Sequence, residues 1–348
     1  MAIRNSTIVW DHWHIEASSI CALRCPRCPR AEVNESLLNR SLTLKFFQTQ
    51  LGENIVRQIK KITFCGNDGD PIYCREFLEI ISWLKEVNSS INLTIITNGS
   101  WKSKKWWNTL ANLLNENDTI HWSLDGWSQE SNEIYRVNSD WNTIMSGIEV
   151  FTNTNSSTYR VWATIAFKFN ESDLVKMENL ASNLGFDNFQ ITKSTKFGSK
   201  YPTQYPRDLL EPSKEWVAKE HRFERVNKLL TKKNDPNLEI KLNLFLKRSQ
   251  DIIKYNQYPA LCSVGNKGVF LNSRGEFFPC CWVANRYEHN QWWLTQAKEK
   301  FNLWNRTFEE VIGDSFWSED FLKYESQECQ TKCTHEALAK NNTHATEW

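Results

Sequence analysis

The chain has 348 residues, of which 40% are hydrophobic and 24% charged, and its formal net charge is +1. This composition is that of an ordinary globular protein, long enough for one large domain and a smaller one. A total charge near zero supplies no field that favours nucleic acid or an acidic membrane surface as a partner. The first twenty residues are too polar for a signal peptide, and no apolar run approaches the ~20 residues that span a bilayer. We therefore expect a cytoplasmic protein without nucleic-acid or membrane partners, and its oligomeric state stays open.

Strands and helices are predicted to alternate through the first 195 residues. The expected strands are His14–Ile20, Lys61–Cys65, Asn92–Thr97, Thr119–Leu124, Val161–Phe169 and Asn188–Thr192. The expected helices are Leu44–Lys60, Arg75–Val87, Trp101–Asn115, Trp141–Phe151 and Ser172–Leu184, with starts at Thr43 and Asp173 and an end at Gly185. This alternation predicts parallel βα units with right-handed crossovers, and hence an α/β fold. Periodicity alone leaves an open sheet and a partial barrel as alternatives.

The pattern changes after residue 195. Residues 196–260 are rich in Lys, Pro and Tyr and are expected to form a helical connector, with a charged helix near Ser213–Thr231. From residue 261 onward, Gly268–Asn272 and Glu276–Trp282 flank a Ser-Arg-Gly turn and predict a β-hairpin. Helices near Phe308–Ile312 and Glu319–Tyr324 follow. The expected organisation is therefore 1–195, 196–260 and 261–348.

Ten cysteines are many for a cytoplasmic protein, where disulfides are disfavoured. Three lie within residues 21–28, two at positions 65 and 74, and five between 262 and 333. Two groups at opposite ends of the chain predict two metal or redox sites.

The first group, Cys21, Cys25 and Cys28, places three thiols on one short loop after the first expected strand. Soft sulfur ligands on separate irons suit a [4Fe–4S] cluster, and three of them leave one iron open for chemistry. A zinc site is the alternative, with His12 or His14 as its fourth ligand.

Three more motifs follow the next expected strands: Gly66–Pro71, Thr97–Gly99 and Asp125–Gly126. Because the carboxyl ends of parallel strands meet at one edge of a sheet, we expect these motifs to share one rim with the cysteine loop. Glycines there let the backbone approach a ligand closely.

The Cys-x3-Cys-x2-Cys motif resembles that of the radical S-adenosylmethionine (SAM) superfamily. The resemblance implies a partial (β/α)6 barrel in which SAM chelates the open iron and is reductively cleaved to a 5′-deoxyadenosyl radical that abstracts a substrate hydrogen. Arg27 departs from the pattern, because the residue before the third cysteine is commonly aromatic.

The other rim motifs agree with this resemblance. Gly66–Pro71 is similar to the family's Gly-Gly-Glu-Pro segment, with Asp70 in place of glutamate, and Ser123–Gly126 followed by Arg136 resembles a segment that contacts SAM. The implied SAM-binding residues are Gly66, Asn67, Asp68, Gly69, Asp70, Thr97, Asn98, Ser123, Asp125 and Arg136.

The second group contains Cys262, Cys280 and the pair Cys329-x3-Cys333. Four thiolates fit either a fully ligated [4Fe–4S] cluster or structural zinc, and spacing does not decide between them. The run Cys262-x12-Gly275-x4-Cys280 resembles the SPASM/twitch extension of radical SAM enzymes, in its shorter α+β twitch form. The resemblance implies an auxiliary [4Fe–4S] cluster held by Cys262, Cys280, Cys329 and Cys333, with Cys281 as a rival for Cys280.

These expectations describe an oxidoreductase with SAM and two [4Fe–4S] clusters, supplied with electrons by a flavodoxin or ferredoxin. It would oxidise, cyclise or cross-link a peptide or protein side chain. The alternatives are the same chemistry on a sugar, aminoglycoside or nucleotide, and a non-enzymatic zinc or electron-carrier protein. Cys65 is a candidate hydrogen donor, although a small buried apolar role is the commoner one for such a cysteine.

Overall fold

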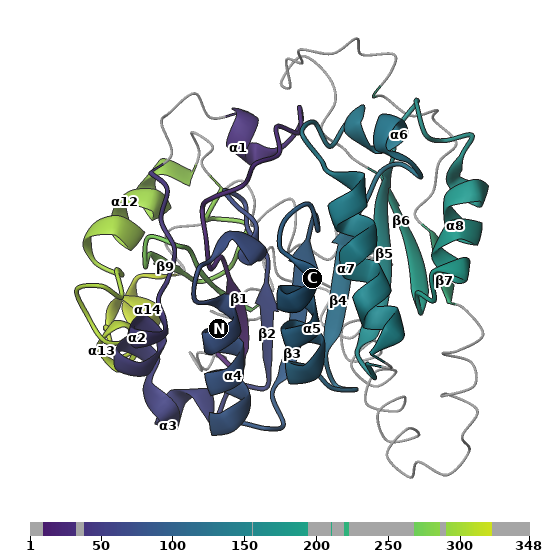
Figure 1. The fold of residues 1–348 in the computed structure, drawn as a ribbon. Coiled ribbons are helices and arrows are strands. Elements are labelled where there is room, and N and C mark those ends of the chain that lie inside the picture. Colours follow the sequence, from purple (N-terminus) through teal and green to yellow (C-terminus); the bar gives the residue numbers. More distant parts are fainter. Residues whose placement is uncertain are drawn as a thin grey trace, which may run out of the picture.

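The computed structural model describes residues 10–32, 38–154, 156–193, 210, 219–222, 268–285 and 290–321. Within these ranges the strands form one sheet in the order β7-β6-β5-β4-β3-β2-β1-β8-β9 (Figure 1). Neighbouring strands from β1 to β6 are parallel and follow chain order. Six consecutive parallel strands confirm the predicted α/β fold of a partial barrel.

The six strands are β1 His12–Ile15, β2 Lys61–Phe64, β3 Asn92–Thr97, β4 Thr119–Ser123, β5 Tyr159–Ala166 and β6 Asn188–Lys193. The first strand is shorter than predicted and ends before the cysteine loop. Beyond Glu16 the backbone leaves the sheet, and Ser19 N–H donates to Arg40 O at 2.9 Å instead. Residues 16–20 therefore belong to the rim of the sheet.

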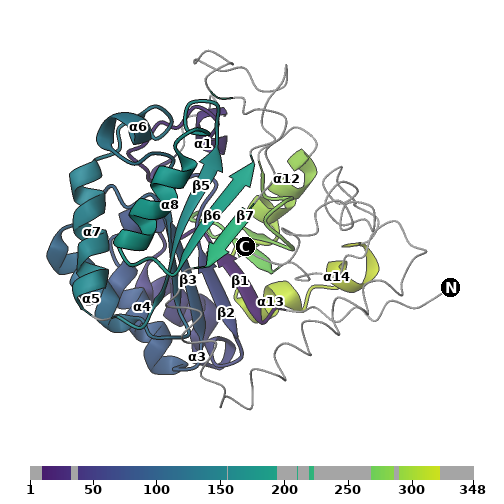
Figure 2. The same ribbon diagram turned by 90° about the vertical axis from the view of Figure 1, so that its right-hand side faces the viewer.

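Helices cover one face of the sheet. They are α1 Pro29–Glu32, α2 Leu44–Phe46, α3 Gly52–Val56, α4 Phe77–Val87, α5 Lys104–Leu113, α6 Gln129–Glu133, α7 Trp141–Asn153 and α8 Leu174–Asn183, with a π-turn at Phe47–Leu51 and a 3₁₀ turn at Pro71–Tyr73. Thr43 caps α2 as predicted, and Gly185 follows α8 with φ 76°. In Figure 2, α3, α4, α5, α7 and α8 lie on one side of the strands, whereas α1 and α6 lie at the end where β5 and β6 finish.

The expected single helix Leu44–Lys60 is broken in two. Gly52, with φ 71°, separates the π-turn from α3. Only glycine adopts this conformation readily, so the chain changes direction there instead of continuing the helix.

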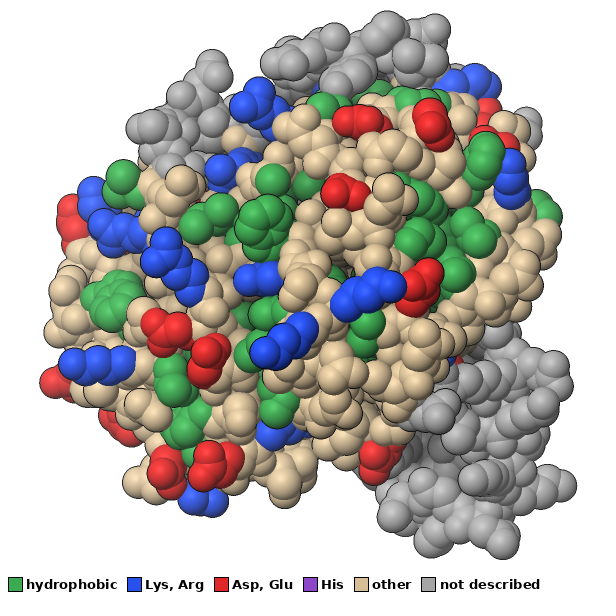
Figure 3. Space-filling model, in the orientation of Figure 1, with side chains coloured by type: hydrophobic (Ala, Val, Ile, Leu, Met, Phe, Trp, Pro, Cys, Tyr) green, Lys and Arg blue, Asp and Glu red, His purple; other side chains and the backbone are tan. Residues whose placement is uncertain are grey.

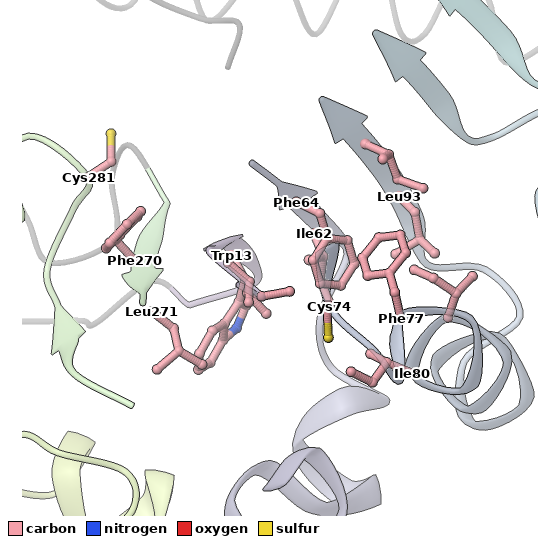
Figure 4. Packing of buried hydrophobic residues seen from close by; sticks show 14 of the residues in the cluster. Trp13, Ile62, Phe64, Cys74, Phe77, Ile80, Leu93, Phe270, Leu271 and Cys281 are labelled. Carbon is pink, nitrogen blue, oxygen red and sulfur yellow. The ribbon is translucent and has the colours of Figure 1, made fainter. Parts of the chain in front are cut away.

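The hydrophobic core lies between these helices and the sheet. Figure 4 shows Cys74 among Ile62, Phe77 and Ile80. The Cys74 side chain is fully buried, and its Sγ donates to Leu42 O at 3.3 Å. Cys74 is thus a core residue.

The predicted C-terminal hairpin is confirmed, and it extends the barrel sheet. β8 (Val269–Leu271) pairs in parallel with β1, and β9 (Phe277–Phe278) pairs antiparallel with β8. The helices that follow are α12 Gln291–Glu299, α13 Phe308–Ile312 and α14 Phe316–Glu319. α13 has the predicted bounds. α14 shares only Glu319 with the helix expected near Glu319–Tyr324, whose last three residues lie outside the described residues. Because the ring of Trp13 lies 4.8 Å from that of Phe308, the two parts of the chain share one core.

Part of the expected connector forms a strand. Lys219–Arg222 is β7, antiparallel to β6 at the edge of the sheet. The helix predicted over Ser213–Thr231 is therefore wrong at these four residues, and the rest of that span lies outside the described residues. An edge strand offers unpaired N–H and C=O groups, and pairing with them outweighs local helix propensity.

Charge is mixed on the surface. On the face seen in Figure 3, acidic and basic side chains are interspersed, in agreement with the near-neutral total. Among the described residues, no helix combines the length and the apolar character needed to cross a bilayer.

Candidate active site at the carboxyl ends of the strands

The cysteine loop follows β1, and backbone hydrogen bonds hold it internally and to the segment at Val137. Cys28 N–H donates to Cys25 O at 3.1 Å, and Arg24 N–H donates to Val137 O at 3.0 Å. Cys21, Cys25 and Cys28 contact one small apolar cluster that also contains Leu23, Tyr135 and Phe167. The fold therefore gathers the three predicted ligands in one place.

Burial sets the protonation of these sulfurs. It raises the pKa of Cys21 and of Cys25 to about 12, so both are neutral thiols near pH 7. Cluster ligands are thiolates, so binding iron would release protons from this loop. Three soft donors on one loop fit a [4Fe–4S] cluster that keeps one iron open.

The two histidines that the zinc alternative needs have partners of their own. In the described part of the chain, no three His, Cys, Asp or Glu side chains are close enough to hold a single metal ion. His12 Nε2 lies 3.5 Å from Thr63 Oγ1, and the His14 ring nitrogen hydrogen-bonds Cys65 Sγ. The two histidines thus contact side chains of β2 and of the residue that follows it.

The glycine-rich loop after β2 packs tightly against the segment that leads into the cysteines. A Cβ atom at Gly69 would overlap the Ser18 carbonyl oxygen, so only glycine fits there. Asp70 N–H donates to Ile20 O at 3.1 Å, and Arg30 Nη1 donates to Asp68 O at 2.6 Å. Close packing therefore fixes the position of the glycine-rich loop relative to the segment that leads into the cysteines.

Asp70 joins three of the four rim motifs. Its carboxylate accepts from Thr97 Oγ1 at 2.9 Å and from Asn98 at both the backbone N–H (2.7 Å) and Nδ2 (2.6 Å). Asn98 Nδ2 also lies 3.6 Å from Cys21 Sγ. Burial raises the pKa of Asp70 to about 6, although these donors favour the charged form. Asp70 therefore orients an amide beside the first cysteine.

The fourth motif reaches the second cysteine. Arg136 Nε lies 2.6 Å from Asp125 Oδ2, and Arg136 also hydrogen-bonds Cys25. The other Asp125 oxygen accepts from Ile165 N–H at 2.7 Å. Ser123, at the end of β4, is half-buried. The four predicted motifs thus converge on one rim.

This rim lies in a segment of the chain that resembles a known protein family. Residues 15–181 match the model of the Radical SAM superfamily. The matched segment contains β2 to β5, the three cysteines and all ten expected SAM-binding residues. No curated protein matches the chain.

Solved structures of other proteins resemble the fold of this chain. SuiB of Streptococcus suis bound to precursor peptide SuiA has a TM-score of 0.55 and 16% identity, over 89% of this chain and 67% of that one. SuiB bound to S-adenosylmethionine has a TM-score of 0.52 and 13% identity, and the match covers 94% of this chain and 69% of that one. Native anSMEcpe with bound AdoMet has a TM-score of 0.53 and 15% identity, and the match covers 88% of this chain and 82% of that one. At these identities the likeness shows the fold.

Two further charged groups, Glu16 and Arg274, lie behind this rim. Glu16 is buried, and its Oε2 accepts from the N–H groups of Asn67 (2.7 Å) and Asp68 (3.0 Å). Arg274, in the hairpin turn, donates to Asp68 Oδ2 at 2.9 Å. A charged residue in a turn is usually solvated, so no local signal distinguishes this arginine.

The expected auxiliary site is described only in part. Cys280 and Cys281 follow β9; Cys281 belongs to the hydrophobic core, and Cys280 is half-buried beside it. Cys262, Cys329 and Cys333 lie outside the described residues.

Proposed function

We propose that this chain is a radical SAM enzyme in which Cys21, Cys25 and Cys28 hold a [4Fe–4S] cluster and SAM takes the open iron. The bound cluster and SAM would supply a 5′-deoxyadenosyl radical that removes a hydrogen atom from the substrate. The observation that carries this proposal is the meeting of three cysteines with Asn98 and Arg136 on the rim of a sheet whose sequence matches the radical SAM model.

The surrounding residues have separate roles in this proposal. Asn98 and Arg136 steady the sulfurs of Cys21 and Cys25 through hydrogen bonds. Backbone groups of Gly66–Asp70 would receive the amino group of SAM, since glycines allow that close approach. Arg136 offers a forked donor to its carboxylate.

The contacts to the rest of SAM would come from the ends of β3 and β4. Thr97 and Ser123 carry hydroxyl groups there, and Asp125 keeps Arg136 in place through their ion pair. The hydroxyl groups would bind the ribose.

The second cluster is assigned to Cys262, Cys280, Cys329 and Cys333. Full ligation by protein would make it an electron acceptor or conduit, which suits net oxidation of a substrate radical. An external flavodoxin or ferredoxin would supply the electron that starts each turnover.

The proposed substrate is a peptide or protein side chain. Support comes from the fold shared with SuiB, whose structure holds a precursor peptide. The small-molecule alternative, a sugar, aminoglycoside or nucleotide, is tested by offering both classes to the same reconstituted protein.

Cys65 is proposed as a hydrogen donor to a substrate radical. Cys65 directly follows β2, and the ring of His14 on the neighbouring strand β1 hydrogen-bonds its sulfur. Burial raises the pKa of this thiol. Donation would leave a thiyl radical, which one electron from the external reductant and one proton would restore. Deuterium from heavy water should enter the product in the native enzyme and not in Cys65→Ala.

The decisive experiment is anaerobic reconstitution with iron and sulfide, followed by SAM and dithionite. Two cubanes require about eight irons per chain. The proposal expects 5′-deoxyadenosine from the native protein and none from Cys21→Ala. A fully iron-loaded protein that makes none would refute it, and a colourless protein with stoichiometric zinc would favour the zinc alternative.

A further inference from the structure

The turn of the C-terminal hairpin reaches the glycine-rich loop of the rim. Arg274 Nη1 donates to Asp68 Oδ2 at 2.9 Å, and Ser273 Oγ donates to Glu16 Oε1 at 3.4 Å. Both acceptors lie in the N-terminal third of the chain, and both are buried. Two consecutive turn residues therefore bind the loop Gly66–Asp70 from behind, one directly and one through Glu16.

The guanidinium of Arg274 is held in a fixed orientation. Its Nε and Nη2 lie 3.0 and 2.9 Å from Glu276 Oε2, and Asn272 Nδ2 donates to the same oxygen at 2.6 Å. Gly275 follows with φ 77°, where an added Cβ would overlap the Trp304 ring. These contacts fix the conformation of the turn that presents Arg274 to Asp68.

Charge makes this contact specific for arginine. Glu16, Asp68 and Glu276 bring three carboxyl groups into a buried region, and Arg274 is in contact with two of them. A buried carboxylate without a partner is strongly destabilising. The planar fork of arginine binds two carboxylates at once, which a lysine ammonium on a flexible stem does less well.

The loop Gly66–Asp70 links the Arg274 contact to the sulfur of Cys21. Asp68 is two residues from Asp70, whose carboxylate orients Asn98 beside Cys21. Glu16 fixes the two N–H groups that precede Gly69. A displacement at the hairpin turn therefore reaches the loop that would receive SAM.

We infer that Arg274 is a positioning residue for SAM, through which the C-terminal hairpin sets the conformation of the loop Gly66–Asp70. This inference rests on the proposed function for its kinetic part. In the part of the chain that the structure describes, Arg274 pairs with Asp68 and Glu276 and with no cysteine, so it would act on the site through the loop. The chemical step should survive its loss while SAM binding weakens.

The test compares Arg274→Gln and Arg274→Lys with a matched control, Arg306→Gln. Arg306 also pairs with a carboxylate in the C-terminal part, Asp314 Oδ2 at 3.1 Å, and the hydrogen-bond partners of its side chain among the described residues are Lys300, Glu310 and Asp314. In Arg274→Gln we expect the KM for SAM to rise about tenfold, a loss of about 1.4 kcal/mol in binding, with kcat for 5′-deoxyadenosine within twofold. Arg274→Lys should lie between, and Arg306→Gln should match the native protein.

A second readout needs no turnover. Amide hydrogen exchange at Asn67, Asp68 and Asp70 should accelerate in Arg274→Gln and stay unchanged in Arg306→Gln. Guanidinium ion added to Arg274→Ala should restore the KM, which it would not do for a general folding defect. If Arg274→Gln does not fold, Arg274→Lys takes its place in both measurements.

The outcomes separate the two claims. Native amide exchange together with a native KM in the Arg274 variant would overturn the positioning role. A kcat loss of tenfold with an unchanged KM would overturn it as well. Absence of 5′-deoxyadenosine from the native, fully iron-loaded protein would instead refute the proposed function.

Discussion

Arg136 and Asp125 form an ion pair of 2.6 Å in which the carboxylate is fully buried and the guanidinium side chain is 16% exposed. The same arginine hydrogen-bonds Cys25, so one cation serves both a carboxylate and the site proposed to hold the cluster. The Asp125 carboxylate also ties this arginine to β5, through Ile165 N–H. The pair therefore matters for stability as well as for the chemistry of the site.

Replacing Arg136 by methionine should lower the free energy of unfolding by about 3–5 kcal/mol, because it leaves the Asp125 charge buried and unpaired. The control is Arg57→Met, which breaks an exposed pair with Glu53 and should cost no more than about 1 kcal/mol. Urea unfolding of the iron-free protein measures both. Equal losses would show that Asp125 is compensated by its backbone donors alone.

Alanine at Cys21, Cys25 or Cys28 should abolish both the absorbance of the N-terminal cluster and the formation of 5′-deoxyadenosine. Each change leaves the proposed cubane with two protein ligands. Cys74→Ala is the matched control, since that thiol lies in the core and donates to Leu42 O. It should keep turnover and lose about 1 kcal/mol of stability. Turnover that survives any of the first three changes would refute the ligand assignment.

Gly69→Ala should raise the KM for SAM strongly, because the new methyl group would overlap the Ser18 carbonyl and push the loop away from the cysteines. The comparison is Gly52→Ala, which has open space around it but a φ of 71°. That change should cost about 1–2 kcal/mol of stability by backbone strain alone and leave the KM unchanged. Similar KM values in both variants would argue against close packing at Gly69.

Stability should fall between pH 6.5 and pH 8.5 because of Glu16. Burial first, and then the Asp68 charge, raise the pKa of this carboxyl from 4.5 to about 8. The folded state therefore binds more protons than the unfolded state between these two values, and the free energy of unfolding decreases as the pH rises through that window. The expected loss is about 2 kcal/mol over these two pH units.

The Glu16→Gln variant isolates this contribution, since the titration of His14 and Asp70 is nearly complete below pH 7.5. Its unfolding free energy should change less with pH than that of the native protein. Parallel pH curves for the two proteins would show that Glu16 stays ionised in the fold.

Local patterns predicted most of the fold and the rim. The bounds of β3 agree with the prediction, because Asn92–Thr97 is apolar, β-branched and followed by Asn-Gly. The cysteine loop and the three motifs after it are expected on one rim because each follows a strand, and parallel strands bring those ends together. The resemblance of these motifs to the radical SAM superfamily supplied Asp70, Asn98 and Arg136 as candidate site residues.

Local sequence patterns do not predict which distant segments of the chain pair with one another. β8 lies beside β1, and only that placement brings Arg274 to Asp68. β7 formed at Lys219–Arg222 because the edge of β6 was available to it, although the sequence there has helical character. The early end of β1 likewise depends on contacts with residues 38–42.

The parallel pairing of β8 with β1 has a consequence for how this protein can be divided. A fragment that stops before residue 268 would leave one side of β1 without hydrogen-bond partners. It would also expose the face of Trp13 that packs on Phe277 and Phe308. Such an edge pairs with other chains, so the excised N-terminal part should aggregate. Chimeras that exchange the C-terminal part with another protein must therefore carry the hairpin as part of the barrel.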